Sequence, residues 1–191
     1  MSTLNATQTP TGYQVHDPAT APEGSREILE GAKEKLGFVP NLYGVFAEAP
    51  TALAAYSKLG DLFGSTSLTP TEQNVVQLAV SATNGCDYCM AAHTAIANMS
   101  EVPQDVIEAL RTGKPIADSK LQALRVYVQE TVELRGWPTE EARRSFSEAG
   151  YTRQNALEVV LGVTMKTLSN YTNHLASTPL DEQFKPFAWK N

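Results

Sequence analysis

The chain has 191 residues and a mass of 20.7 kDa, with 42% hydrophobic and 19% charged residues. This composition excludes a wholly disordered chain, which combines low hydrophobicity with high charge. The net charge of -6 and the pI near 5.1 argue against a nucleic-acid partner, because no basic excess is available to neutralise phosphates. No apolar run approaches the roughly 20 residues that cross a bilayer, and the start of the chain carries no export signal. We therefore expect a cytoplasmic protein that binds neither membrane nor nucleic acid.

The N-terminal region differs in composition from the rest of the chain. Residues 1–22 are polar, hold three of the eleven prolines and show no periodicity. They are predicted to form an extended arm, either loose or laid over a neighbouring subunit. From Gly24 onward, apolar residues recur at helical spacing in nearly every segment. Residues 23–191 are therefore predicted to form a single all-helical domain.

Eight helices are expected in chain order, at about residues 28–36, 50–62, 70–80, 86–96, 103–110, 120–134, 140–149 and 155–176. The third has the strongest start, because Thr69 suits the N-cap, Pro70 suits the first helical position and Glu72 completes a capping box. No hairpin signal is found between alternating apolar runs. The predicted fold class is all-α, a helical bundle.

A weak internal similarity appears when the chain is shifted by 81 positions. The shift aligns Asn74 with Asn155 and His93 with His174. The alignment is equally consistent with a duplicated two-fold helical unit and with a chance match. If the unit is duplicated, its second copy has lost both cysteines. His174 itself lies in an apolar helix and is predicted to be a hydrogen-bonded structural histidine.

The strongest chemical signal is the pair Cys86 and Cys89, followed by His93. At about 100° per residue, the two cysteines lie about 60° apart on a helix, and His93 lies about 40° from Cys89. A thiolate near a helix N-terminus is stabilised by unpaired backbone N–H groups, and a histidine one turn later can take its proton or stabilise its charge. The other cysteine can then close a disulfide on the oxidised one. The three residues are predicted to form a redox-active catalytic site.

The cysteine pair allows other interpretations. Two cysteines are too few for a disulfide scaffold, and both could be buried as small hydrophobic residues. A zinc ion could bind Cys86, Cys89 and His93, but no second CxxC or HxxxH supplies a fourth ligand. Covalent haem is excluded because Met90, rather than histidine, follows the second cysteine. We therefore expect no metal and no cofactor.

The stretch from Leu68 to Thr94 resembles the alkyl hydroperoxidase D family of the carboxymuconolactone decarboxylase superfamily. Its most specific feature is the CxxCxxxH pattern of the three site residues. Residues 36–42 and 168–181 resemble flanking regions of the peroxidase-related branch, so the likeness extends roughly over 25–189. The resemblance implies an all-helical fold that assembles as a symmetric homo-oligomer.

The resemblance also implies roles. In this family the second cysteine usually attacks peroxide, the first resolves the product and the histidine relays protons; here these are Cys89, Cys86 and His93. The implied partners are a peroxide substrate and a dithiol reductant protein. Two positions depart from the pattern: Asn74 stands where a relay glutamate is usual, and Tyr88 replaces a histidine often found between the cysteines. An asparagine cannot shuttle a proton by ionising.

The sequence thus predicts a thiol-dependent peroxidase, an antioxidant oxidoreductase that reduces organic or hydrogen peroxides through an intramolecular disulfide. Two alternatives stay open. One is a carboxymuconolactone decarboxylase-type enzyme, whose chemistry does not need a cysteine pair. The other is a non-catalytic, redox-sensing helical oligomer, which the replacement of the relay glutamate by Asn74 favours.

Overall fold

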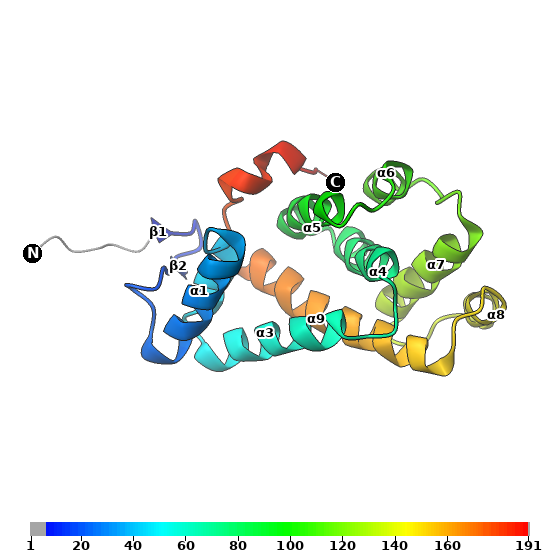
Figure 1. Ribbon diagram of the computed structural model, residues 1–191, viewed down its shortest axis with the longest axis horizontal. Helices are drawn as coiled ribbons and strands as arrows, with labels where there is room; N and C mark the ends of the chain where they lie inside the picture. Colours follow the sequence, from blue (N-terminus) through cyan, green and yellow to red (C-terminus); the bar gives the residue numbers. More distant parts are fainter. Residues whose placement is uncertain (1–6, 191) are drawn as a thin grey trace, which may run out of the picture.

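The computed structural model describes residues 7–190, and these are almost entirely helical (Figure 1). The helices are α1 (Glu23–Leu36), α2 (Asn41–Phe46), α3 (Pro50–Gly64), α4 (Pro70–Thr83), α5 (Asp87–Met99), α6 (Gln104–Thr112), α7 (Ser119–Glu133), α8 (Glu140–Glu148), α9 (Arg153–Ala176) and the 3-10 helix η1 (Glu182–Phe187). Two short strands, β1 (Thr7–Gln8) and β2 (Gln14–Val15), pair antiparallel. The predicted all-α class is confirmed. Within the described part of the chain, no helix is both long and apolar enough to span a membrane.

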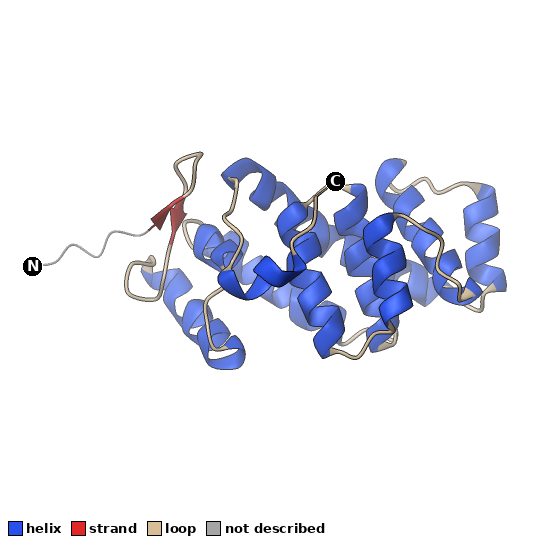
Figure 2. Cartoon of the chain, turned by 90° about the horizontal axis from the view of Figure 1, so that it is seen from above, coloured by secondary structure: helices blue, strands red, loops and turns tan. Residues whose placement is uncertain are grey.

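Helix α4 lies at the centre of the bundle. It packs against α5, α7 and α9, while α3 lies along α9 on the lower side of Figure 1. Figure 2 shows that the molecule is elongated, with the strand pair at one end. The side chains of Val75, Val76, Leu78 and Val80 on α4 are fully buried. Burial on several sides explains why α4 carries a nearly continuous apolar run rather than a narrow stripe.

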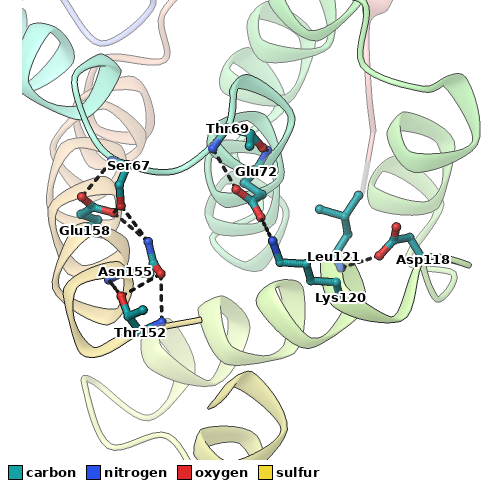
Figure 3. Close-up of polar contacts among 9 residues, drawn as sticks. All are labelled: Ser67, Thr69, Glu72, Asp118, Lys120, Leu121, Thr152, Asn155 and Glu158. Carbon is teal, nitrogen blue, oxygen red and sulfur yellow. Dashed lines mark hydrogen bonds and ion pairs between the residues drawn. The ribbon is translucent and has the colours of Figure 1, made fainter. Parts of the chain in front are cut away.

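The predicted start of α4 is confirmed in detail (Figure 3). Glu72 N–H donates to Thr69 Oγ1 at 3.2 Å, and Thr69 N–H donates to Glu72 Oε2 at 2.8 Å, which completes the capping box. The other carboxylate oxygen lies 2.8 Å from Lys120 Nζ at the start of α7. Glu72 therefore joins α4 to α7.

A second capping box begins α9 and ties that helix to the loop before α4 (Figure 3). Thr152 and Asn155 cap each other, and Asn155 Nδ2 donates to Ser67 Oγ at 2.9 Å. Glu158 accepts from both the backbone and the hydroxyl of Ser67. These contacts fix the register of α9, the helix that carries several site residues described below.

The region expected to be an extended arm folds onto its own chain. Residues 7–15 form a small hairpin, although the sequence showed no hairpin signal, because its strands have two residues each and too little apolar alternation to be recognised. His16 N–H donates to Gly44 O at 3.1 Å, and Thr11 Oγ1 donates to Ala176 O at 2.6 Å. A Cβ on Gly44 would lie 2.6 Å from His16 O, so this close approach requires glycine. Residues 1–6 of the predicted arm lie outside the described residues.

Two short elements were not expected, α2 and η1. Helix α2 follows Pro40 and has only six residues, and η1 has a proline inside it, so neither shows a sustained helical period.

The two segments of the internal similarity also differ in structure. The first is α4 and α5 separated by a turn, whereas its counterpart is the continuous helix α9. The similarity therefore does not extend to a shared two-helix unit.

Candidate active site

The two cysteines lie at the junction of α4 and α5. Gly85 adopts a φ of 63°, which favours glycine, and turns the chain so that Cys86 N–H donates to Ser81 O at 2.9 Å. Cys86 is then the N-cap of α5, and Cys89 lies in its first turn. Both are free thiols and each is only 1% exposed. The structure therefore places the pair at a helix N-terminus, as the sequence predicted.

The Cys89 sulfur contacts side chains of α9. Asn173 Nδ2 donates to Cys89 Sγ at 3.2 Å, and Ser169 Oγ lies 3.8 Å from the same sulfur. A nitrogen that donates to sulfur favours the thiolate over the thiol. The sequence alone did not identify Asn173 or Ser169 as site residues. The only signal was that both are polar and lie on a mostly apolar helix.

Lys166 on α9 is the most consequential residue that the sequence analysis missed. Its side chain is fully buried at 0% exposure, and its Nζ makes no hydrogen bond within residues 7–190. A buried amine without a partner is costly and calls for a compensating negative charge. A lone lysine in the run Leu161–Leu168 was the available signal.

The electrostatics make Cys89 the thiol that ionises first. Burial by itself raises the pKa of Cys89, but the hydrogen bond from the Cys86 thiol and the positive charge of Lys166 outweigh it, so this pKa lies well below the usual value. The hydrogen bond to Cys89, reinforced by burial, raises the pKa of Cys86. The pair is therefore differentiated into a thiolate and a protonated thiol that donates to it.

His93 lies one turn further along α5 and is 8% exposed. Burial, together with the charge of Lys166, lowers the pKa of His93 well below its usual value. The imidazole is therefore neutral at pH 7. A neutral ring can accept or relay a proton, but it does not supply a positive charge to stabilise a thiolate. That charge comes from Lys166.

Cys89, His93 and Lys166 together border one cavity of about 610 Å³. Most of its other lining side chains are aromatic or aliphatic, among them Phe38, Tyr43, Tyr56, Tyr88, Ile96 and Phe184. A concave, mainly apolar site with a few convergent polar groups is typical of a small-molecule site. Among residues 7–190, no three His, Cys, Asp or Glu side chains gather closely enough to hold a metal ion.

Tyr88, between the cysteines, is fixed by a buried carboxylate. Its hydroxyl donates to Asp181 Oδ2 at 2.5 Å and accepts from Leu42 N–H at 3.2 Å. Asp181 Oδ1 accepts from Asn41 N–H at 2.9 Å. Burial raises the pKa of Asp181, and burial followed by the Asp181 charge raises the pKa of Tyr88. Although Asp181 directly precedes η1, its side chain is a buried carboxylate rather than a solvated charge at a helix start.

Two further residues differ from expectation or from the family pattern. Asn74 is buried, and its Nδ2 donates to Pro70 O at 2.8 Å, so it bonds to its own helix. His174 is exposed, with its ring centroid 6.4 Å from that of Tyr171, and is not a buried structural histidine.

The fold and the paired thiols define a class, the all-helical proteins with an alkyl hydroperoxidase D-like fold. A peroxidase-related protein from Ralstonia eutropha JMP134, described as an alkylhydroperoxidase AhpD core, aligns with a TM-score of 0.79 and 23% identity, over 90% of this chain and 93% of that one. A peroxidase-related protein from Silicibacter sp. TM1040 aligns with a TM-score of 0.70 and 20% identity, over 96% and 95% of the chains. The apo debrominase Bmp8 aligns with a TM-score of 0.75 and 16% identity, over 98% and 97%.

A sequence comparison gives a match over part of the chain. Residues 47–128, which include the dithiol, match the profile of the carboxymuconolactone decarboxylase family. The matched segment spans 82 of the 191 residues, and together with the shared fold it confirms the predicted resemblance to the alkyl hydroperoxidase D-like proteins of the carboxymuconolactone decarboxylase superfamily. A comparison with curated proteins gives no significant match.

Proposed function

We propose that the protein is a thiol-dependent peroxidase in which Cys89 attacks, Cys86 resolves and His93 moves protons. The observation that carries this proposal is the differentiated dithiol: a buried thiolate at Cys89, next to a protonated thiol, opens on an apolar cavity. A substrate in that cavity meets the nucleophile directly. The match of residues 47–128 to the carboxymuconolactone decarboxylase family and the alkyl hydroperoxidase D-like fold support a peroxidase-related role.

The oxidative half-reaction follows from these groups. The Cys89 thiolate attacks the terminal oxygen of a hydroperoxide, the O–O bond breaks and the alkoxide leaves. The alkoxide takes a proton that comes from water, and the neutral imidazole of His93 on the same cavity wall can relay it by donating from one nitrogen while the other accepts. Cys89 is then a sulfenic acid. The Cys86 thiol condenses with it, so that a disulfide forms and water leaves.

Lys166 replaces part of the proton relay that the family pattern assigns to a glutamate. Asn74 occupies that position, and its amide cannot take up or release a proton as a glutamate carboxylate does. The Lys166 ammonium instead holds Cys89 as a thiolate before the substrate arrives. The nucleophile is therefore activated by a fixed charge rather than by a proton transfer at the moment of attack.

A second candidate function uses the same cavity. One structural relative is a debrominase, and a cysteine-to-alanine variant of that protein has been solved with 2,3,4-tribromopyrrole. The aromatic lining of the cavity here suits a flat halogenated ring. In such a reaction the Cys89 thiolate would take the halogen as a sulfenyl halide while the ring carbon takes a proton. The Cys86 thiol would then displace halide to form the disulfide.

The deciding experiment measures hydroperoxide consumption coupled to a dithiol reductant. Cys89→Ser should abolish turnover, whereas Cys86→Ser should allow one oxidation per chain and then stop. Parallel assays with a halogenated pyrrole, followed by halide release, separate the two candidates. A protein that forms the Cys86–Cys89 disulfide but never turns over is a redox sensor. A decarboxylase would retain lactone decarboxylation in the double variant Cys86→Ser/Cys89→Ser, and that result would refute the proposal.

The family resemblance also supports assembly with further copies of the chain, and α9 offers a surface for it. Four exposed apolar side chains, Leu157, Val160, Tyr171 and Leu175, fall within a sector of about 60° along this helix. Exposed apolar stripes of this kind mark protein–protein contacts. We propose that this stripe is the contact between copies.

A further inference from the structure

A hollow of about 550 Å³ lies where the ends of α4 and α6 meet α7 and the last residues of the chain. The charged side chains on its border are Arg111, Arg125, Lys190 and Glu133, and we call it the cationic hollow. Within residues 7–190 it shares no lining residue with the 610 Å³ cavity that Cys89 borders. The two spaces can therefore be studied separately.

The cationic hollow has an excess of positive charge in a chain whose net charge is -6. Three of its charged side chains are cations, and Glu133 is the one carboxylate among them. None of the ion pairs formed within residues 7–190 includes any of the four. Partial negative charges at the ends of α4, α6 and α7 reduce the positive excess without removing it. An anion from solution is the expected complement of such a surface.

Arg125 is the most deeply buried of the three cations, with 6% exposure. Its guanidinium donates to the backbone oxygen of Lys114, but its Nε is buried and has no hydrogen-bond partner in residues 7–190. Burial lowers the pKa of Arg125 and of Arg111, although both arginines stay charged at pH 7. Buried polar atoms normally have partners and buried charges normally have counter-charges. Arg125 therefore calls for an acceptor that the described residues do not supply.

Arg111 is held in place by neutral oxygens rather than by a carboxylate. Its Nη1 donates to Thr94 Oγ1 at 2.9 Å and to Phe187 O at 3.0 Å, and its Nη2 donates to Ala188 O at 3.0 Å. Trp189 Nε1 donates in turn to Arg111 O at 2.7 Å, which fixes the indole at the border of the hollow. These bonds orient the guanidinium and the indole but leave the charge of Arg111 unneutralised.

We propose that the cationic hollow binds the oxyanion of a small molecule, a carboxylate or a phosphate monoester, with Arg125 as its main partner. A guanidinium presents its N–H groups as a planar fork that fits either oxyanion with two hydrogen bonds. Lys190 is exposed and attracts the anion from solvent, and Trp189 offers a flat wall for the rest of the molecule. A volume of about 550 Å³ is in the range of small-molecule sites. The proposal does not depend on the chemistry of the cysteines.

The first test observes Trp189 directly. The chain has two tryptophans, and Trp137 is 78% exposed, so Trp137→Phe leaves Trp189 as the only tryptophan without disturbing the core. Phenyl phosphate and benzoate, which share a ring and differ in the oxyanion, are titrated into this variant at constant ionic strength. At least one should change the fluorescence of Trp189 saturably with a Kd below about 1 mM, and neutral benzyl alcohol should not. The probe that binds more tightly identifies the oxyanion, and no saturable change with either overturns the proposal.

The second test supplies the missing counter-charge from the chain itself. Gln129 borders the hollow four residues after Arg125 on α7, so Gln129→Glu places a carboxylate of nearly the same shape where it can pair with that guanidinium. In the Trp137→Phe background this change should weaken binding of the better probe by about tenfold or more. Gln183→Glu is the matched control, because it adds the same charge at an exposed residue that does not border the hollow. Equal affinities in the two variants would overturn the proposal.

The third test separates the hollow from the 610 Å³ cavity, which has a cation of its own. Lys190→Gln changes an exposed side chain that borders the hollow, and it should weaken binding of the better probe by about twofold or more. Lys166→Met removes the buried cation that borders the cavity, and it should leave the affinity unchanged. The opposite pattern would place the anion beside Cys89 and would rule out the hollow as its site.

Discussion

The Tyr88 hydroxyl donates a 2.5 Å hydrogen bond to the buried carboxylate of Asp181, and this contact joins the first turn of α5 to the segment that begins η1. Tyr88 borders both the cavity of about 610 Å³ that Cys89 lines and a separate hollow of about 310 Å³ that Cys86 lines. One side chain thus forms part of the wall between the two spaces. Its position depends on a carboxylate that lies 93 residues away in the sequence.

Removing this hydroxyl should destabilise the fold. In Tyr88→Phe the Asp181 carboxylate stays buried but loses its phenol partner, so we expect the free energy of unfolding to fall by about 1–3 kcal/mol. Urea denaturation at pH 7 measures the change. Tyr43→Phe is the control, because Tyr43 is a partly buried tyrosine that lines the same cavity without a carboxylate partner. Equal losses in the two variants would show that the bond to Asp181 contributes nothing specific.

Replacing Lys166 should raise the pKa of Cys89. In Lys166→Met the positive charge that favours the thiolate is gone, while burial continues to favour the thiol. The thiolate absorbance in the ultraviolet should therefore appear at higher pH, and the rate of oxidation by hydroperoxide at pH 7 should fall by about tenfold or more. Lys35→Met, at the exposed rim of the cavity, should leave the titration unchanged.

The same variant has a second readout in the redox equilibrium. In the reduced protein the Cys89 thiolate compensates Lys166, whereas a disulfide leaves the buried ammonium without its counter-charge. Lys166 therefore stabilises the dithiol form and makes the disulfide more oxidising. Lys166→Met should be harder to reduce in a dithiothreitol redox buffer. A variant that is easier to reduce would contradict the assigned role of the charge.

His93 should make the fold sensitive to acid. Its pKa is lowered in the folded state, so below the unfolded value of about 6.5 the unfolded chain binds a proton that the folded chain does not. The free energy of unfolding should accordingly fall as the pH drops from 7 to 5, by up to about 2 kcal/mol from this residue. His93→Gln should flatten that part of the pH profile, and His174→Gln, at an exposed position, should not. Parallel profiles for His93→Gln and the unmodified chain would exclude the effect.

Local sequence signals predicted the helices and the dithiol because they act over a few residues. The Thr69–Glu72 capping box and the placement of Cys86 and Cys89 at a helix start depend on spacing within one turn or two. Lys166 and Asn173 could not be assigned in the same way, because only the packing of α9 against α5 brings them to a sulfur 77 to 84 positions earlier in the chain. Spacing along one helix identifies the reacting groups, but it does not reveal the charge that activates them.

Replacing Gly162 by alanine should destabilise the fold, even though alanine is the better helix former. A Cβ at this position of α9 would lie 2.6 Å from Phe63 Cε2 and 2.8 Å from Val76 Cγ1, both on fully buried side chains. Gly162→Ala should therefore destabilise the protein by about 1–3 kcal/mol through overpacking. Gly60→Ala on α3 meets no atom within 4 Å and should instead stabilise it, by about 0.5–1 kcal/mol. Thermal denaturation of the two variants tests this difference in sign.

The apolar stripe on α9 should hold copies of the chain together. Leu157 is 73% exposed and Leu175 is 67% exposed, and 18 residues of helix place them about 27 Å apart along one face. Light scattering should therefore give a mass that is a multiple of 20.7 kDa for the unmodified chain. Leu157→Glu should lower that mass, because each contact would then bury an unpaired carboxylate. Thr164→Ser, on the same exposed face of α9, is the control. Glu158→Gln would not serve, because Glu158 accepts a hydrogen bond from Ser67. A mass of 20.7 kDa for the unmodified chain, or an unchanged multiple in Leu157→Glu, would contradict this role for the stripe.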